Sequence, residues 1–217
     1  MPTRNEKGRI FDGFISGSVY DALATLVGFG PRLYERACDE IPLQPGMRVL
    51  DLGCGTGAMA FPMAKRVGDS GKVIGVDLSS SQLERGRSKS ERLGADIEWM
   101  LCSVDELPFE DRSFDAVVSA MSFHEVARES VPGALAETRR VLRDDGFFAL
   151  VDWSRPRFGL LTALWWPFLL FDYTSDNYQN RYAEMSSRSG LGLAKDVYLN
   201  SMVRCQVFRP EPSADGA

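Results

Sequence analysis

The chain has 217 residues, a formal net charge of −5 and a composition that is 44% hydrophobic and 25% charged. This composition is typical of a globular domain with a sizeable core, and it excludes a disordered chain. The acidic balance and the absence of a long basic run argue against nucleic-acid binding.

The residues before the first predicted strand belong to no βαβ unit. Residues 18–29 and 32–41 are predicted to form two short helices, with a break at Gly28–Pro31. These helices contain several aromatic residues. Two interpretations are open: the helices cover part of the ligand edge of a sheet, or they pack on its outside.

From residue 48 onward, apolar runs rich in β-branched residues alternate with helical segments. This alternation predicts the βαβ units of a Rossmann-like, doubly wound parallel sheet. The predicted strands are Arg48–Leu52, Lys72–Asp77, Ile97–Cys102, Phe114–Ala120 and Gly146–Asp152. The predicted helices are Ala58–Val67, Ser80–Leu93 and Glu129–Leu142.

The C-terminal part departs from this alternation. A helix is predicted at Gln179–Ser189, followed by strands at 193–200 and 202–208 with a brief turn between them. Strands so close in sequence must pair antiparallel, because a parallel crossover needs a dozen or more residues. We therefore predict an α/β fold with a seven-stranded, mostly parallel sheet and a C-terminal antiparallel hairpin.

Three regions are expected along the chain. Residues 1–45 are predicted to form an N-terminal helical cap, and residues 46–209 the main domain with an apolar insertion at 157–178. Residues 210–217 have the composition of a disordered tail.

A glycine-rich turn follows the first strand of the main domain, in the sequence VLDLGCGTG at residues 49–57. Ligands of open α/β sheets bind outside the carboxyl ends of the strands, where the strand order reverses. Gly53, Gly55 and Gly57 allow the backbone to approach a ligand there without a Cβ in the way. Their spacing is G-x-G-x-G, which differs from the G-x-G-x-x-G of a dinucleotide fingerprint.

Two acidic residues narrow the class of ligand. Asp51 precedes the first glycine by two residues, and an acid pointed at the turn repels a pyrophosphate but favours a cationic group. Asp77 ends the second strand, where an acid binds the hydroxyls of an unphosphorylated ribose. A cationic amino-acid end, a sulfonium and a free ribose together describe S-adenosylmethionine.

Four sequence landmarks occur in order at matching spacing. They are VLDLGCGTG, VIGVDLS, ELPFEDRSFDAVVSA and ALAETRRVLRDDGFFALVDWSRP. Together they resemble the class I S-adenosylmethionine-dependent methyltransferases over residues 11–156. Within that class the chain is most similar to the ubiquinone/menaquinone-biosynthesis C-methyltransferases, in its N-terminal segment and in VDWSRP.

The resemblance implies a set of cofactor contacts. It places Thr56 in the glycine turn, Asp77 with its neighbour Leu78 at the ribose, Ser103 and Val104 near the adenine, and Ala120 near the methionine end. Two of these positions depart from the family pattern. Ser103 stands where an Asp is common, and Ala120 stands where a Ser is common, so backbone contacts are expected to substitute.

The single histidine, His124, follows the fourth strand and is therefore expected at the ligand edge. Its ordinary pKa suits a general base, and a structural role in the pocket wall is the alternative. The quinone family is expected to carry Arg-Asn where this chain has His124-Glu125. For Glu125 a surface position is favoured over a role in orienting the imidazole.

An apolar stretch from Phe158 to Phe171 follows the fifth strand and contains two adjacent tryptophans. It is shorter than the roughly 20 residues of a membrane span. A lid over an apolar acceptor is favoured, and an interfacial membrane helix, a dimer surface and ordinary core are the alternatives.

The four cysteines, Cys38, Cys54, Cys102 and Cys205, are widely separated and form no CxxC pair. Neither a metal site nor a disulfide framework is predicted. The N-terminus lacks the apolar region of a secretory signal, so a cytoplasmic protein, with or without peripheral membrane contact, is expected.

The sequence therefore predicts methyl transfer from S-adenosylmethionine to an apolar small molecule, a quinone precursor or a lipid. The alternative is a cofactor-binding protein without transferase activity that regulates a partner. Carbon, oxygen and nitrogen all stay open as the methylated atom.

Overall fold

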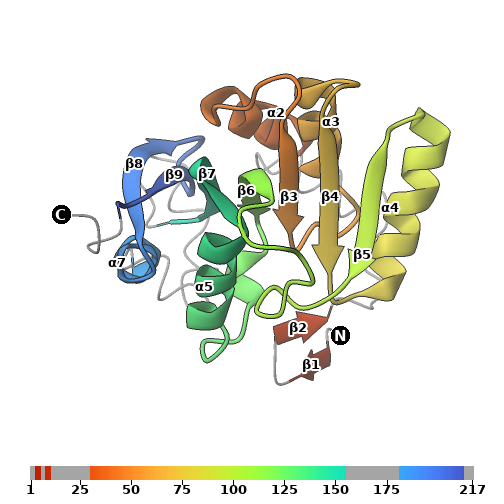
Figure 1. The fold of residues 1–217 in the computed structure, drawn as a ribbon. Helices are drawn as coiled ribbons and strands as arrows, with labels where there is room; N and C mark the ends of the chain where they lie inside the picture. The colour runs from red at the N-terminus through yellow and green to blue at the C-terminus, as the bar shows by residue number, and fades with distance from the viewer. Residues whose placement is uncertain (1–2, 6–7, 11–29, 155–180, 213–217) are drawn as a thin grey trace.

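The computed structural model describes residues 3–5, 8–10, 30–154 and 181–212 of the chain. Its centre is a seven-stranded sheet with the strand order β5-β4-β3-β6-β7-β9-β8 (Figure 1). The strands are β3 (Arg48–Leu52), β4 (Lys72–Asp77), β5 (Ile97–Leu101), β6 (Phe114–Ala120), β7 (Leu142–Trp153), β8 (Leu191–Tyr198) and β9 (Val203–Pro210). The pairs among β3 to β7 are parallel, whereas β9 pairs antiparallel with both β7 and β8. The predicted fold class is confirmed.

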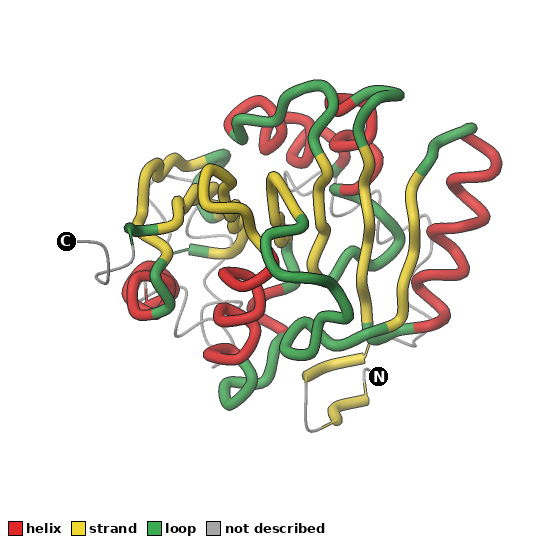
Figure 2. Tube along the Cα trace, in the orientation of Figure 1, coloured by secondary structure: helices red, strands yellow, loops and turns green. Residues whose placement is uncertain are grey.

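Helices cover both faces of the sheet (Figure 2). One core cluster joins the sheet to α2 (Pro31–Glu40), α3 (Ala60–Val67) and α4 (Ser80–Leu93). The other joins it to α5 (Val131–Val141) and α7 (Arg181–Arg188). The central strands are therefore buried on both sides, which explains why they are continuous apolar runs in the sequence.

Capping residues set the helix ends. The Ser79 side chain accepts a hydrogen bond from the Gln82 amide at the start of α4, and Gly94 ends that helix in the left-handed conformation. Pro31 opens α2, and Gly68 follows α3 with a positive φ. The predicted bounds of α4 match the structure at both ends for this reason.

The predicted bounds of β3, β4 and β6 also match, whereas those of several other elements differ by a few residues. The helix predicted from Ala58 begins at Ala60, because the glycine turn extends to Met59. The strand predicted from Gly146 begins at Leu142 and passes a register irregularity opposite Phe114 and Ala116. Such irregularities hide a strand's start, since they interrupt its residue pattern.

A short two-stranded ribbon, β1 (Thr3–Asn5) with β2 (Gly8–Ile10), lies within the region predicted as a helical cap. Strands of three residues are too short to show an alternating pattern, so the sequence did not predict them. The predicted helix at 18–29 and the apolar stretch at 158–171 lie outside the described residues. Within the described residues, no helix is long and apolar enough to cross a membrane.

Candidate cofactor and acceptor site

The reversal of strand order places the candidate site. β3 pairs with β4 on one side and with β6 on the other, both in parallel. The carboxyl ends of these three strands therefore meet at one edge, outside which α/β sheets bind their ligands. The glycine turn follows β3, Asp77 ends β4 and Ala120 ends β6. The structure thus brings the glycine turn, Asp77 and Ala120, which the sequence predicts as cofactor contacts, to one edge of the sheet.

The three glycines of the turn differ in their surroundings, although all have positive φ values. A Cβ at Gly53 would lie 2.6 Å from the Ser122 side chain, and one at Gly57 would lie 2.5 Å from the Trp99 ring. A Cβ at Gly55 would meet no described atom within 4 Å. Two glycines thus serve close packing, and Gly55 is the one whose backbone faces open space.

The carboxylate of Asp51 is buried with one oxygen unpaired. The residue is 1% exposed, and its Oδ2 has no hydrogen-bond partner among the described residues. Burial, reinforced by the charge of Asp77, raises the pKa of Asp51 well above its ordinary value. A buried acceptor without a donor is costly, so this oxygen is suited to a ligand that brings a cationic donor.

Asp77 ties the second strand to the glycine turn. Its two carboxylate oxygens accept hydrogen bonds from the amides of Gly55 and Ser79, each at 2.8 Å. The amide of Gly53 also donates to the Val76 carbonyl at 2.9 Å. These bonds fix the Asp77 carboxylate beside the turn, with the half-buried Leu78 next to it. A carboxylate oxygen can accept more than one hydrogen bond.

Thr56 lines an open groove between the glycine turn and one face of α4. The other residues that line this groove are Ser81, Glu84, Arg85, Ser88, Lys89 and Arg92. The side chains that line the groove are all polar or charged, and the groove runs along the exposed side of the helix.

Ser103 and Val104 follow β5, whose end is joined to β4 by the hydrogen bond from the Cys102 amide to the Asp77 carbonyl at 3.2 Å. Ser103 is buried, and its hydroxyl donates to the Asp105 carboxylate. Asp105 thus brings a carboxylate to Ser103, the position where the family commonly has an Asp. Asp105 is not among the site residues that the sequence predicts.

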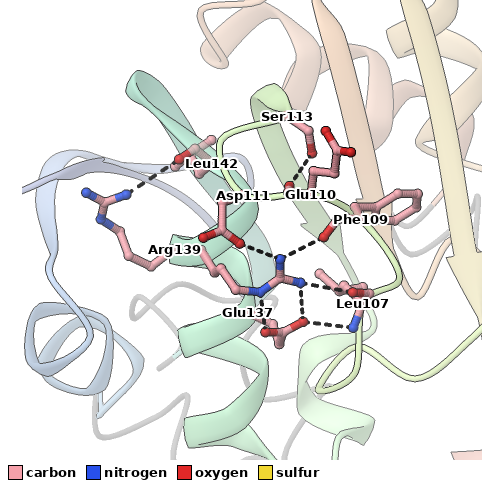
Figure 3. A network of polar contacts seen from close by, with 9 residues as sticks. Leu107, Phe109, Glu110, Asp111, Ser113, Glu137, Arg139 and Leu142 are labelled. Atoms are coloured by element: carbon pink, nitrogen blue, oxygen red, sulfur yellow. Dashed lines mark hydrogen bonds and ion pairs between the residues drawn. The ribbon is translucent and has the colours of Figure 1, made fainter.

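A polar network anchors the loop that carries these residues (Figure 3). Arg140 of α5 donates to the carbonyls of Leu107 and Phe109 at 2.9 and 2.7 Å, and it pairs with Glu137 and Asp111. The Glu137 carboxylate in turn accepts the Leu107 amide at 2.9 Å. Its hydrogen bonds to Arg140 lower the pKa of Glu137, so the pair stays ionised. The loop is held from two sides by charge-assisted bonds.

The turn after β6 is strained and tied to the neighbouring strand. Met121, next to Ala120, is a non-glycine residue with a φ of 54°, in the left-handed region. The Ser122 hydroxyl donates to the Leu52 carbonyl and contacts the Ser119 hydroxyl, both at 2.8 Å. Strain of this kind persists where the surroundings fix the backbone, and it gathers at functional sites.

His124 lies in the short helix η1 (Phe123–Glu125), directly after this turn. Its side chain is 12% exposed, and its Nδ1 is 2.7 Å from Oδ1 of Asp152 near the end of β7. The amide of His124 also donates to Oδ2 of Asp152 at 3.0 Å. The expected position of His124 at the ligand edge agrees with this geometry.

The expectation for Glu125 was wrong. Its side chain is 20% exposed, and its Oε1 lies 3.3 Å from Nε2 of His124. A short helix folds this side chain back onto the imidazole, which the sequence pattern did not reveal. Asp152 was also missed, although an acid that ends an apolar strand at the ligand edge is a signal for it.

Comparison with known proteins identifies the family. A family described as "Methyltransferase domain" matches residues 49–146. The chain is 31% identical over 197 residues to a ubiquinone/menaquinone biosynthesis C-methyltransferase from Bordetella avium, covering 87% of this chain and 76% of that protein. The chain belongs to the class I S-adenosylmethionine-dependent methyltransferases.

Two further comparisons agree with this family. A 2-phytyl-1,4-naphtoquinone methyltransferase from Trichormus variabilis is 37% identical over 156 residues, covering 70% of this chain and 66% of that protein. A crystal structure of a SAM-dependent methyltransferase from Aquifex aeolicus has a TM-score of 0.68 at 21% identity, covering 87% of this chain and 97% of that one. That structure supports the fold alone. The chain spans about two thirds of the length of the curated relatives it matches.

The residues at the edge fit S-adenosylmethionine, the cofactor of this family. The unpaired oxygen of Asp51 suits an ammonium group, and the open side of Gly55 leaves room beside the turn. Asp77 offers acceptors for hydroxyl donors at the adjacent strand end.

Proposed function

We propose that this methyltransferase transfers the methyl group of S-adenosylmethionine to an apolar small molecule, a quinone precursor. The main observation that supports binding of S-adenosylmethionine is the buried Asp51 carboxylate, whose Oδ2 lacks a partner among the described residues. The choice of a quinone precursor as the acceptor is supported by two relatives, which are named as quinone methyltransferases in Trichormus variabilis and Bordetella avium.

The bound cofactor supplies an activated methyl group on a sulfonium. In the proposed arrangement Asp51 binds the ammonium end, Asp77 and Leu78 contact the ribose, and Ser103 and Val104 contact the adenine. Gly53, Gly55, Thr56 and Gly57 form the turn beside the cofactor, and Ala120 lies near its methionine end. The protein's main contribution to such a displacement is to hold donor and acceptor in line.

His124 is proposed to contact the acceptor rather than the cofactor. It is 12% exposed and lies after β6, beyond the turn that Met121 and Ser122 form. A quinone precursor in its reduced, dihydroxy form is electron-rich enough to accept a methyl group, and it gives up one proton for the group it gains. In this proposal the acceptor's hydroxyls contact the side chains around His124.

The test is turnover with defined acceptors. The purified protein is incubated with S-adenosylmethionine bearing a deuterated methyl group and with reduced 2-phytyl-1,4-naphthoquinone. A simple water-soluble phenol is tested in parallel. We expect a product heavier by one labelled methyl group with the prenylated acceptor, and fragmentation in the mass spectrometer locates the methylated atom.

Two results would contradict the proposal. Cofactor binding without turnover on the prenylated quinol, or on any compound of a lipid extract, would favour the non-catalytic regulatory alternative. Turnover only on the soluble phenol would retain the transferase and exclude the apolar acceptor.

A further inference from the structure

The imidazole of His124 lies between two carboxylates, one at each ring nitrogen. Nδ1 is 2.7 Å from Asp152, and Nε2 is 3.3 Å from Glu125. A neutral imidazole has one N–H donor and one acceptor nitrogen, whereas carboxylates only accept. Only the doubly protonated ring can satisfy both neighbours.

The carboxylate of Asp152 is held in place independently of the ring. Asp152 is 3% exposed, and besides His124 Nδ1 it accepts the amides of His124 and Trp153, at 3.0 and 2.7 Å. Three N–H donors thus hold this buried carboxylate beside the ring. The carboxylate at Nδ1 is therefore a fixed part of the fold.

We propose that His124 is held as an imidazolium between Asp152 and Glu125, with Asp152 as the residue that positions it, and that Glu125 is the group that accepts a proton from the acceptor. This proposal deepens the proposed function and rests on it for the identity of the acceptor. The bond between the acceptor and the methyl group forms as the bond between the methyl group and the sulfonium breaks, which leaves a neutral thioether. The proton of the acceptor's hydroxyl passes to the Glu125 carboxylate, which becomes a neutral acid, and His124 stays charged throughout.

The charges around the ring support this arrangement. Burial has the largest influence on the imidazole and lowers its pKa, but the charge and hydrogen bond of Asp152, together with those of Glu125, outweigh burial and raise the pKa of His124 to about 10. Asp152, Arg204 of β9 and Tyr182 of α7 all line one small cavity. Arg204 is itself paired with Asp196, which balances its charge.

The arrangement changes the role of His124 in the reaction. A general base needs an unprotonated nitrogen at the working pH, and an imidazolium near neutral pH has none. Asp152 is buried and already accepts hydrogen bonds from two amides and the ring. Glu125, at 20% side-chain exposure, is the more accessible of the two carboxylates.

The single histidine makes a direct test possible without resonance assignment. The protein is labelled with ¹⁵N-histidine, and the two ring nitrogens are followed by NMR from pH 6 to 9. We expect both nitrogens to be protonated across this range in the wild type. In Asp152→Asn the imidazole should titrate about 1–3 pH units lower, because a close opposite charge raises a cation's pKa by that amount.

Two further variants complete the test. Glu125→Gln should lower the titration as well, and it carries the test if Asp152→Asn does not fold. Asp115→Asn, which removes a carboxylate at the other end of β6, should leave the histidine signals unchanged. A neutral ring at pH 7.5 in the wild type would overturn the proposal. So would unchanged titration in both carboxamide variants.

Kinetics tests the assignment of the base. With a working acceptor, kcat/KM of the wild type should show no ascending limb near the ordinary histidine pKa, and Glu125→Gln should lose on the order of 10²-fold or more in kcat. Normal turnover in Glu125→Gln would remove Glu125 from the chemistry. The NMR titration needs neither cofactor nor acceptor. It therefore tests the charge state of His124 even if the proposed function is wrong.

Discussion

Neutralising Asp51 should remove a pH-dependent destabilisation of the free protein and make the cofactor bind less tightly. Asp51 is 1% exposed, its Oδ2 has no partner among the described residues, and its pKa is raised by burial and then by Asp77. The ordinary pKa is 3.8, so the folded state binds the proton more tightly than the unfolded state does. Asp51 therefore contributes no penalty below that pH, and it destabilises the fold progressively as the pH rises.

The buried Asp51 carboxylate can take up a proton instead of staying charged. The free energy of unfolding that the protein loses to Asp51 therefore has an upper bound. One pKa unit corresponds to about 1.36 kcal/mol, so the wild type can lose at most about 2 kcal/mol by pH 5 and about 4 kcal/mol by pH 7. In Asp51→Asn this pH dependence disappears. The buried amide has its own cost of about 1–3 kcal/mol, but that cost does not vary with pH. The decisive quantity is therefore the slope of stability against pH.

The assay is urea unfolding of both proteins between pH 5 and 7. The difference in unfolding free energy should shift in favour of Asp51→Asn as the pH rises. Asp115→Asn is a matched control, since Asp115 accepts the Arg48 amide at 2.7 Å and pairs with Arg143, and its loss should destabilise. Parallel stability curves for wild type and Asp51→Asn would refute the reasoning.

Calorimetry with S-adenosylhomocysteine should then show roughly ten- to a hundredfold weaker binding to the variant, as for a lost charge-assisted bond.

Four other variants, with one control, separate effects on cofactor binding from effects on folding. Asp77→Ala should weaken S-adenosylmethionine binding roughly ten- to a hundredfold by calorimetry, and unchanged affinity would exclude the ribose contact. Gly57→Ala should cost about 1–3 kcal/mol of overpacking against Trp99 and Phe61 in addition to left-handed strain, whereas Gly55→Ala, at an open position, should cost only about 1–2 kcal/mol of left-handed strain in denaturation but reduce cofactor affinity. Arg140→Lys should lose about 2 kcal/mol of stability and weaken cofactor binding by loosening the loop. Arg139→Lys is the control, and equal effects of the two would contradict the anchoring role.

Much of this fold is encoded locally. The strands β3 and β4 are apolar because both of their faces are buried, and α4 ends where Ser79 and Gly94 cap it. The antiparallel direction of the last two strands follows from the short turn between them. These features depend on neighbours in sequence, so the sequence predicts them.

The partners of the site residues depend on contacts across the sheet, and the sequence does not report these. The spacing of Gly53, Gly55 and Gly57 is regular, yet only Gly55 is open, because Ser122, in the turn after β6, and Trp99, in β5, approach the other two. A glycine pattern identifies a tight turn. It does not say which glycine faces a ligand and which one only makes room for a side chain.

The same reasoning explains why His124 was first interpreted as a base. From sequence, an isolated histidine after a strand has its ordinary pKa and a free nitrogen. The fold brings Asp152 to it from a strand 28 residues away, and the turn at Met121 directs η1 so that Glu125 meets the other nitrogen. Two carboxylates then reverse the consequence of burial, which alone would favour the neutral ring. The charge state of a catalytic-looking residue is thus a property of the tertiary structure, and the residue type alone does not determine it.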